Sequence, residues 1–274
     1  MGRYDGILIA SDLDGTFLGK KSRIVQENVD AVRAFCAEGG LFTFATGRHH
    51  EHILQVLPET PALCNIPVIF ANGGYLYDYA TRRVLCETYM DIELTSELMR
   101  YVRAEHRRVG FRATTPQGFI TDGRTDFMRR FIEDARGELY SVEVAPLEGW
   151  TQRLWYKVVF RGMPEDIDAL SVDLRTQFGE MFELNRSSTT FLEVQRCGCS
   201  KGTMLEVLRR VYAQLLGRPV RTYGVGNHEN DLALLSAADV SACPADAEPF
   251  VLERADVILR PHDEGTLADL IGRL

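Results

Sequence analysis

Two aspartates follow the first apolar run of the chain and are two residues apart. The run from Ile7 to Ala10 is too short for a helix and too continuously apolar for a half-exposed strand, so it predicts a buried strand of a parallel sheet. Asp12 and Asp14 lie where this strand ends, and side chains at this spacing in extended backbone point the same way. An isolated pair of this kind is usually a solvated turn. At the carboxyl end of a parallel strand, it is also placed to share a cation or a substrate.

A candidate anion site follows the second apolar strand, Leu41 to Ala45. Thr46 offers a hydroxyl, Gly47 permits close approach of the backbone, and a helix expected from about His49 would offer free N–H groups. A lysine opens a later helix: Lys201 lies in a first turn, where the helix dipole disfavours a cation unless a bound anion is near. Taken alone, these features also fit an ordinary turn and a solvated lysine.

A second set of oxygen ligands lies where another strand turns into a helix, near residues 224–231. Asn227 and Asp231 are four residues apart, and with Asp12 and Asp14 they would supply the oxygens that a hard cation such as Mg²⁺ requires. The alternative for this stretch is an N-capped helix with Asp231 in its first turn. A carboxylate pair, a hydroxyl, a lysine and a second oxygen cluster at four strand ends predict magnesium-dependent phosphoryl transfer.

The elements that must position these residues fall into two patterns. Short apolar strands alternate with amphipathic helices in residues 1–84 and 191–274, which predicts an α/β core with a doubly wound, Rossmann-like parallel sheet. In residues 85–190 the strands alternate apolar with polar positions and pair locally. That pattern predicts an inserted α+β cap domain.

Composition excludes several classes of protein. The 274 residues include 45% hydrophobic and 26% charged residues, which is typical of a globular chain. The net charge of −8 argues against a nucleic-acid partner. No apolar run is long enough for a membrane span, and the N-terminus lacks the features of a signal peptide. The six cysteines are scattered, and Cys197 and Cys199 lack a second pair at zinc spacing, so we expect reduced thiols and a cytoplasmic protein.

Four motifs resemble, in order and spacing, those of the haloacid dehalogenase-like hydrolases, and the resemblance covers essentially the whole chain. The inserted domain resembles the class IIB cap of the Cof-type branch, which includes sugar phosphatases, and the turn at residues 72–74 resembles that branch's turn before the cap. The motifs are Asp12-Leu13-Asp14-Gly15-Thr16, Thr46-Gly47-Arg48, Ser200-Lys201-Gly202 and Gly226-Asn227-His228-Glu229-Asn230-Asp231.

The resemblance implies a role for each matching residue. Asp12 would attack phosphorus and form an aspartyl phosphate, and Asp14 would act first as general acid and then as general base. The phosphate-binding residues would be Thr46, Gly47, Lys201 and Asn230. Magnesium would be held by Asp12, the backbone carbonyl of Asp14, Asn227 and Asp231.

One position departs from the family, which usually has an aspartate where this chain has Asn227. An amide oxygen still binds a hard cation but brings one negative charge fewer, so we expect weaker magnesium affinity. The predicted substrate is a small phosphorylated metabolite, a sugar phosphate or a related monoester. Two other functions remain open: a phosphomutase of the same superfamily, and a phosphometabolite-binding protein with weakened catalysis.

Two further features are left open by the sequence. Arg48 would either reach the substrate or pair with an acid. His49, His50 and His52 lack the i, i+4 pair of a helical metal site, and solvent-facing side chains are expected there.

Overall fold

The structure is a computed structural model that describes residues 2–146 and 153–274. The chain divides into two compact units. The core unit comprises the residues up to Cys86 together with Ser200–Leu274, and the inserted unit comprises Glu87–Cys199. The predicted division placed the boundaries at residues 84 and 190 instead.

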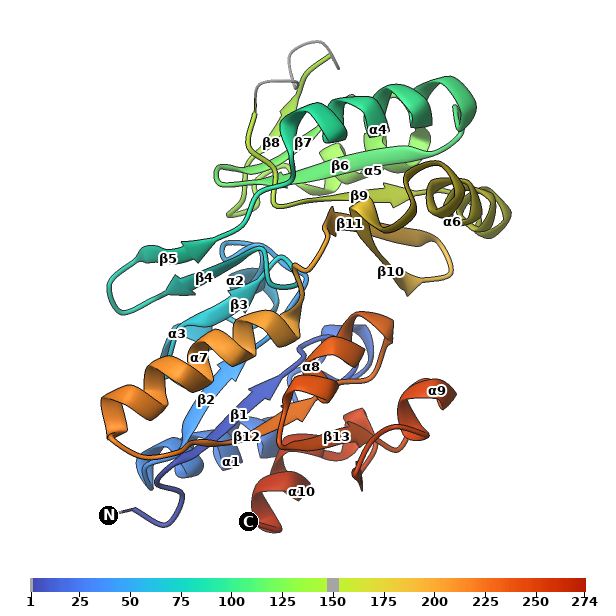
Figure 1. Cartoon of the computed structure of the whole chain (residues 1–274). Helices are drawn as coiled ribbons and strands as arrows, with labels where there is room; N and C mark the ends of the chain where they lie inside the picture. Colours follow the sequence, from blue (N-terminus) through green and yellow to red (C-terminus); the bar gives the residue numbers. More distant parts are fainter. Residues whose placement is uncertain (1, 147–152) are drawn as a thin grey trace. The chain divides into compact units, whose positions relative to one another are not determined.

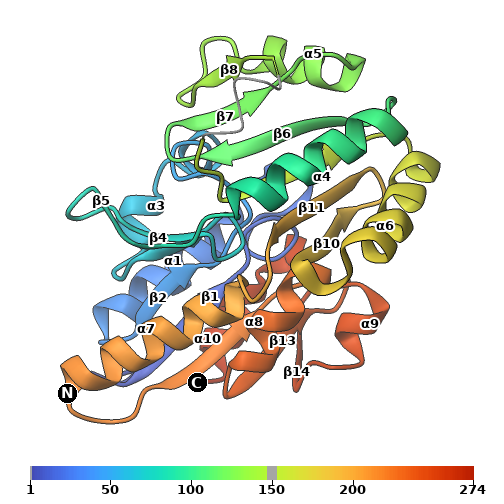
Figure 2. The same cartoon turned by 45° about the horizontal axis from the view of Figure 1, so that its top comes forward.

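The core unit is built on a parallel sheet in the order β14-β13-β12-β1-β2 (Figures 1 and 2). A bridge between Ala45 and Ile69 links the end of β2 to a smaller sheet, β3-β4-β5. The strands are β1 (Ile7–Ser11), β2 (Leu41–Phe44), β3 (Val68–Phe70), β4 (Tyr75–Asp78), β5 (Arg83–Glu87), β12 (Arg221–Val225), β13 (Val240–Pro244) and β14 (Val257–Leu259).

Helices cover both faces of the parallel sheet, as expected for strands that are buried on both sides. In Figure 1, α7 and α8 lie in front of the sheet and α1 lies behind it. The α-helices of the core unit are α1 (Gln26–Ala37), α2 (Ile53–Val56), α3 (Thr60–Leu63), α7 (Lys201–Leu216), α8 (Leu232–Ala237), α9 (Pro249–Leu252) and α10 (Thr266–Gly272). Its 3-10 helices are η1 (Lys20–Ser22), η4 (Glu229–Asp231) and η5 (His262–Glu264).

Strand β1 has apolar side chains on both faces because both faces are covered. Leu8 and Ala10 lie in one hydrophobic cluster with Leu205 of α7 and Leu234 of α8. Ile9, which points the other way, is fully buried as well. The continuous apolar run noted in the sequence therefore has its structural reason, and the predicted doubly wound α/β fold is confirmed.

The inserted unit has one sheet in the order β10-β11-β9-β6-β7-β8, antiparallel except for the β7–β8 pair. Apolar side chains from α4 and α6 pack with those of the strands in one cluster. The elements are α4 (Ile92–Glu105), β6 (Gly110–Thr115), β7 (Gly118–Thr121), α5 (Asp126–Asp134), β8 (Val142–Val144), β9 (Lys157–Arg161), α6 (Pro164–Phe178), η3 (Gly179–Met181), β10 (Phe182–Ser188) and β11 (Phe191–Arg196).

Strand β11 explains where the second boundary falls. It pairs antiparallel with β10 on one side and with β9 on the other, so it is an interior strand of the inserted sheet. A boundary at residue 190 would separate the two strands of the β10–β11 hairpin. The chain instead leaves the inserted unit after Cys199, directly before α7.

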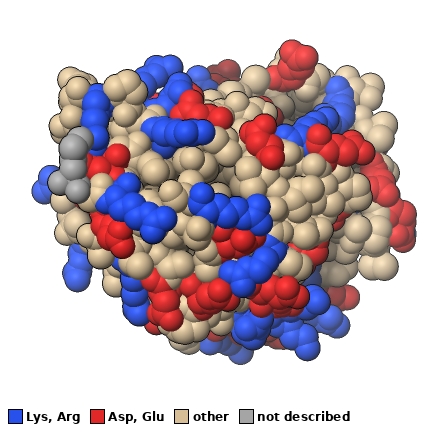
Figure 3. Space-filling view, turned by 90° about the horizontal axis from the view of Figure 1, so that it is seen from below, with Lys and Arg blue, Asp and Glu red and all other residues tan. Residues whose placement is uncertain are grey.

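Surface charge and helix length bear on possible partners. On the face drawn in Figure 3, basic and acidic side chains are interspersed and form no continuous basic patch. Among the described residues, no helix has both the length and the apolar character needed to cross a membrane.

Candidate active site

The nucleophile candidate is anchored where two parallel strands end side by side. Strand β1 ends at Ser11, and the backbone N–H of Asp12 donates to the carbonyl of Val225, the last residue of β12, at 2.7 Å. This bond continues the β1–β12 ladder by one residue. The loops after β1 and β12 therefore begin next to each other, as the convergence of parallel strand ends predicts.

A buried ion cluster joins three of the predicted site residues. The Nζ atom of Lys201 lies 2.6 Å from Oδ1 of Asp12 and 2.5 Å from Oδ1 of Asp231. Lys201 and Asp231 are fully buried, and Asp12 is 6% exposed. One ammonium group is thus shared by two carboxylates in a region that excludes water. Such an arrangement leaves one negative charge uncompensated by these three side chains.

The pKa of Asp12 is raised, in part by this uncompensated negative charge. Burial, and next the neighbouring Asp231 carboxylate, raise this pKa from 3.8 to about 7, although Lys201 acts in the opposite direction. For Lys201, burial alone would lower the pKa, but the two carboxylates outweigh burial and raise it, so the lysine stays charged. Without a further cation the carboxylate of Asp12 is costly to ionise.

The loop after β12 folds tightly around Asp231. The Oδ2 atom of Asp231 accepts the backbone N–H of Asn227 at 2.8 Å and that of His228 at 3.0 Å. A Cβ atom on Gly226 would lie 2.4 Å from the Cβ of Asp231, so a glycine is required there. The side chain of Asn227 meets the first motif instead: its Oδ1 accepts from the hydroxyl of Thr16 at 3.2 Å.

Asp14 is held by Arg48. Its two carboxylate oxygens accept from Nε and Nη2 of Arg48 at 2.8 and 2.7 Å, and Nη1 of Arg48 lies 3.1 Å from Nε2 of His52. Of the two alternatives for Arg48, the structure therefore shows pairing with an acid. A bidentate pair of this kind fixes both the position and the plane of the carboxylate.

The segment after Gly47 differs from the prediction. Residues 50–52 form a turn and α2 begins only at Ile53, so no helix N-terminus follows Gly47 directly. The expectation of solvent-facing histidines was also wrong, because His49 is only 1% exposed and burial lowers the pKa of His50 to about 4. Contacts with Tyr75 explain the turn: its hydroxyl accepts the backbone N–H of His50 at 3.0 Å.

Asn72, a residue with no predicted role in the site, connects the second motif to the fourth. Its backbone N–H donates to the carbonyl of Thr46 at 3.0 Å, and its Oδ1 accepts from Nδ2 of Asn230 at 3.2 Å. Thr46 is buried, and its hydroxyl accepts the N–H of Arg48 at 3.2 Å. The signal in the sequence was the Asn-Gly pair one residue after the end of β3, which is typical of left-handed backbone.

The turn at residues 72–74 also fixes the start of α7. Asn72 and Gly73 both have positive φ angles, 55° and 97°. A Cβ atom on Gly73 would lie 2.1 Å from the carbonyl oxygen of Ser200, the residue that caps α7. Lys201 is therefore held next to this turn by backbone packing as well as by its ion pairs.

Comparison with known proteins identifies the family. The family model described as haloacid dehalogenase-like hydrolase matches residues 9–271. The chain belongs to the haloacid dehalogenase-like hydrolases. The predicted resemblance is thereby confirmed, and so is the prediction of a hydrolase.

Relatives and solved structures agree with this assignment. The Bacillus subtilis protein YxeH, which is named as a phosphatase without a stated substrate, is 26% identical over 97% of both chains. The Escherichia coli pyridoxal phosphate phosphatase YbhA is 25% identical over 96% of this chain and 97% of its own. A HAD/COF-like hydrolase from Plasmodium vivax superposes with a TM-score of 0.82 at 21% identity, covering 99% of this chain and 96% of the other. The predictions of the Cof-type branch and of a phosphatase are confirmed.

The donor atoms of this hydrolase fit a small hard cation. Oδ1 of Asp12 accepts a hydrogen bond only from Lys201 among the residues that the structure describes, and the amide oxygen of Asn227 accepts only from the hydroxyl of Thr16 there, so each oxygen keeps a lone pair for a cation. In the same described part of the chain, no group of three His, Cys, Asp or Glu side chains forms a metal cluster. The predicted ligand set agrees with both observations and has the oxygen chemistry that Mg²⁺ prefers. This set consists of the carboxylates of Asp12 and Asp231, the amide of Asn227 and the backbone carbonyl of Asp14.

Proposed function

We propose that this hydrolase is a magnesium-dependent phosphatase that cleaves a small phosphate monoester through an aspartyl phosphate on Asp12. The observation that carries the proposal is the buried cluster of Asp12, Lys201 and Asp231, with one carboxylate oxygen of Asp12 left without a partner in the described part of the chain. Oδ2 of that carboxylate is the available nucleophile. When bound, Mg²⁺ would neutralise charge on the transferring phosphoryl group.

In the first step Oδ2 of Asp12 forms a bond to phosphorus while the bond from phosphorus to the leaving oxygen breaks. Asp14 donates a proton to that oxygen, and the substrate alcohol departs. For this role an oxygen of Asp14 must be released from Arg48, which holds both oxygens in the structure. Lys201 and the hydroxyl of Thr46 would bind the oxygens of the phosphoryl group.

In the second step Asp14 acts as the base. It removes a proton from water, the water oxygen attacks phosphorus, and the bond between phosphorus and Asp12 breaks to release inorganic phosphate. The amide of Asn230, which is oriented by Asn72, would donate to a phosphoryl oxygen. The metal ligands in this proposal are Asp12, the carbonyl of Asp14, Asn227 and Asp231.

The substrate class we propose is a phosphorylated sugar or a related metabolite. The Escherichia coli relative is named for pyridoxal phosphate, which is a small phosphorylated metabolite. All six cysteines lie within the described residues and are free thiols, which supports the proposed cytoplasmic location.

The test is release of inorganic phosphate from a panel of phosphorylated metabolites, with and without added magnesium. We expect release that requires magnesium and a second product that is the free alcohol. A phosphomutase would instead return an isomerised phosphate ester and little free phosphate. Tight ligand binding without turnover of any ester would favour the binding-protein alternative.

The variant Asn227→Asp should bind magnesium more tightly. Asn227 lies against Thr16, and a carboxylate there would add one negative charge to the proposed ligand set. We expect the magnesium concentration for half-maximal activity to fall by about tenfold, on the scale of one charge-assisted contact. Titration of phosphatase activity with magnesium measures this. An unchanged midpoint would mean that Asn227 is not a ligand.

A further inference from the structure

A cavity lined by basic side chains lies within the inserted unit. Its volume is about 340 Å³, which is enough for a small organic ligand. Arg103 lies in the last turn of α4, and Arg107 lies two residues after the end of that helix. Arg124 lies in the segment between β7 and α5. Val102 and Phe111, both nearly fully buried, supply an apolar lining.

The charge of this cavity is opposite to that of the chain. Three arginines and His106 line it together with a single carboxylate, Asp122, whereas the whole protein has a net charge of −8. Concentration of positive charge around an apolar lining is the arrangement that small anionic ligands require.

The carboxylate of Asp122 does not occupy all the N–H donors of Arg103 and Arg124. Arg103 and Arg124 both approach the same oxygen of Asp122, each at 3.5 Å. Charge-assisted hydrogen bonds between guanidinium and carboxylate groups are normally about 2.7–2.9 Å long. Since each guanidinium has five N–H donors, most donors of these two arginines remain available to a ligand.

Arg107 has still fewer partners. Its Nε donates to the backbone carbonyl of Ala104 at 3.3 Å, and it forms no ion pair within residues 2–146 and 153–274. Asp122 is fixed in place, because its Oδ1 accepts the backbone N–H of Arg124 at 3.1 Å and only 6% of its side chain is exposed. The cavity therefore has an immobile acid that orients two arginines and a third arginine that is not neutralised.

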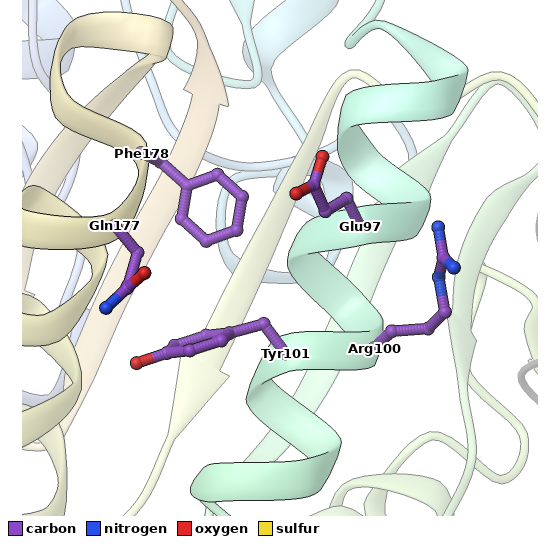
Figure 4. Close-up of a pocket in the computed structure, with 5 residues that line it drawn as sticks. All are labelled: Glu97, Arg100, Tyr101, Gln177 and Phe178. Atoms are coloured by element: carbon purple, nitrogen blue, oxygen red, sulfur yellow. The ribbon is translucent and has the colours of Figure 1, made fainter.

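Another cavity in the inserted unit has balanced charges, unlike the cavity at Arg103, Arg107 and Arg124 (Figure 4). It lies between α4 and α6, and Figure 4 shows Tyr101 and Phe178 with one acid, Glu97, and one base, Arg100. Its volume is about 320 Å³, but its charged groups balance. Of these two cavities, the one at Arg103, Arg107 and Arg124 has an excess of positive charge.

We propose that the cavity at Arg103, Arg107 and Arg124 binds a small organic phosphate through residues of the inserted unit. The three guanidinium groups hold the phosphate, and the apolar part of the ligand lies against Val102 and Phe111. None of these residues belongs to the proposed catalytic set. The site therefore goes beyond the phosphatase function and does not depend on it.

The test uses phenylphosphonate, which carries an anionic phosphonate and an apolar ring and has no ester bond to hydrolyse. Binding to the full chain is measured by isothermal titration calorimetry for the wild type, Arg107→Gln and Asp12→Asn. Arg100→Gln is the matched control: Arg100 lies on α4, seven positions before Arg107, and likewise donates to a backbone carbonyl, that of Ser96 at 3.2 Å.

We expect one binding event that Arg107→Gln weakens by about tenfold or more, the scale of a lost hydrogen bond to a charged group. Arg100→Gln and Asp12→Asn should leave that event unchanged. Equal binding by Arg107→Gln and the wild type would overturn the proposal, and so would loss of all binding in Asp12→Asn. Arg107 has no ion pair to lose, so the variant should fold. Phosphate release from a monoester, measured separately, reports on the phosphatase proposal alone.

Discussion

Replacing Asp12 with asparagine should abolish phosphate release. The amide has the size of the carboxylate but lacks the nucleophilic oxygen that forms the aspartyl phosphate, so we expect the rate to fall by a factor on the order of 10⁴ or more. Steady-state phosphate release with saturating magnesium measures this. The control is Asp5→Asn, which removes a surface carboxylate paired with Arg218 at 2.8 Å and should leave the rate unchanged.

The same variant should not lose stability. Burial and Asp231 raise the pKa of Asp12 to about 7, so its ionised form is disfavoured in the metal-free protein. An acid with a raised pKa costs stability as the pH rises through the range between its unfolded and folded values. At pH 8 without magnesium, Asp12→Asn should therefore be at least as stable as the wild type, and the two should converge near pH 4. A clear loss of stability at pH 8 would contradict the buried, repelled carboxylate.

Replacing Lys201 with methionine should remove both activity and a large part of the folding stability. The ammonium group is fully buried between Asp12 and Asp231, and its loss leaves two carboxylates buried without a cation. Breaking a buried ion pair in this way costs about 3–5 kcal/mol. Denaturant titration in EDTA at pH 8 should show the loss. The loss of stability should become smaller toward pH 5, because the raised pKa of Asp12 means that its carboxylate is then protonated and one buried negative charge is removed.

The double variant Lys201→Met/Asp12→Asn is the matched control for this loss. It removes one of the two carboxylates along with the lysine, so it should regain much of the stability that the single variant loses at pH 8. Neither variant should release phosphate. If Lys201→Met is as stable as the wild type at pH 8, the ion cluster is not the buried unit described above.

The sequence predicted the elements that local pattern determines. The run Ile7–Ala10 is apolar on every residue because helices cover both faces of β1, and that pattern was readable without coordinates. The positions of Asp12 and Asp231 at neighbouring strand ends followed from the parallel topology. The helix that begins at Lys201 was also predicted.

Contacts between distant residues were not predictable in the same way. The sequence left Lys201 either near a bound anion or exposed to solvent, whereas in the structure it is buried and paired with two carboxylates, one of them 189 positions away. The turns after Gly47 depend on Tyr75, and the pairing of Arg48 with Asp14 spans 34 positions. The second domain boundary depends on β11 having partners on both sides. Each of these features is set by tertiary packing rather than by local propensity.

The most direct test of the central proposal is to trap the covalent intermediate. The protein is mixed with magnesium and an aryl phosphate, quenched in acid within the first turnover, digested and analysed by mass spectrometry. The proposal predicts one phosphoryl group on the peptide that contains Asp12, and none in Asp12→Asn. A phosphoryl group on another residue, or phosphate release at the wild-type rate from Asp12→Asn, would contradict it.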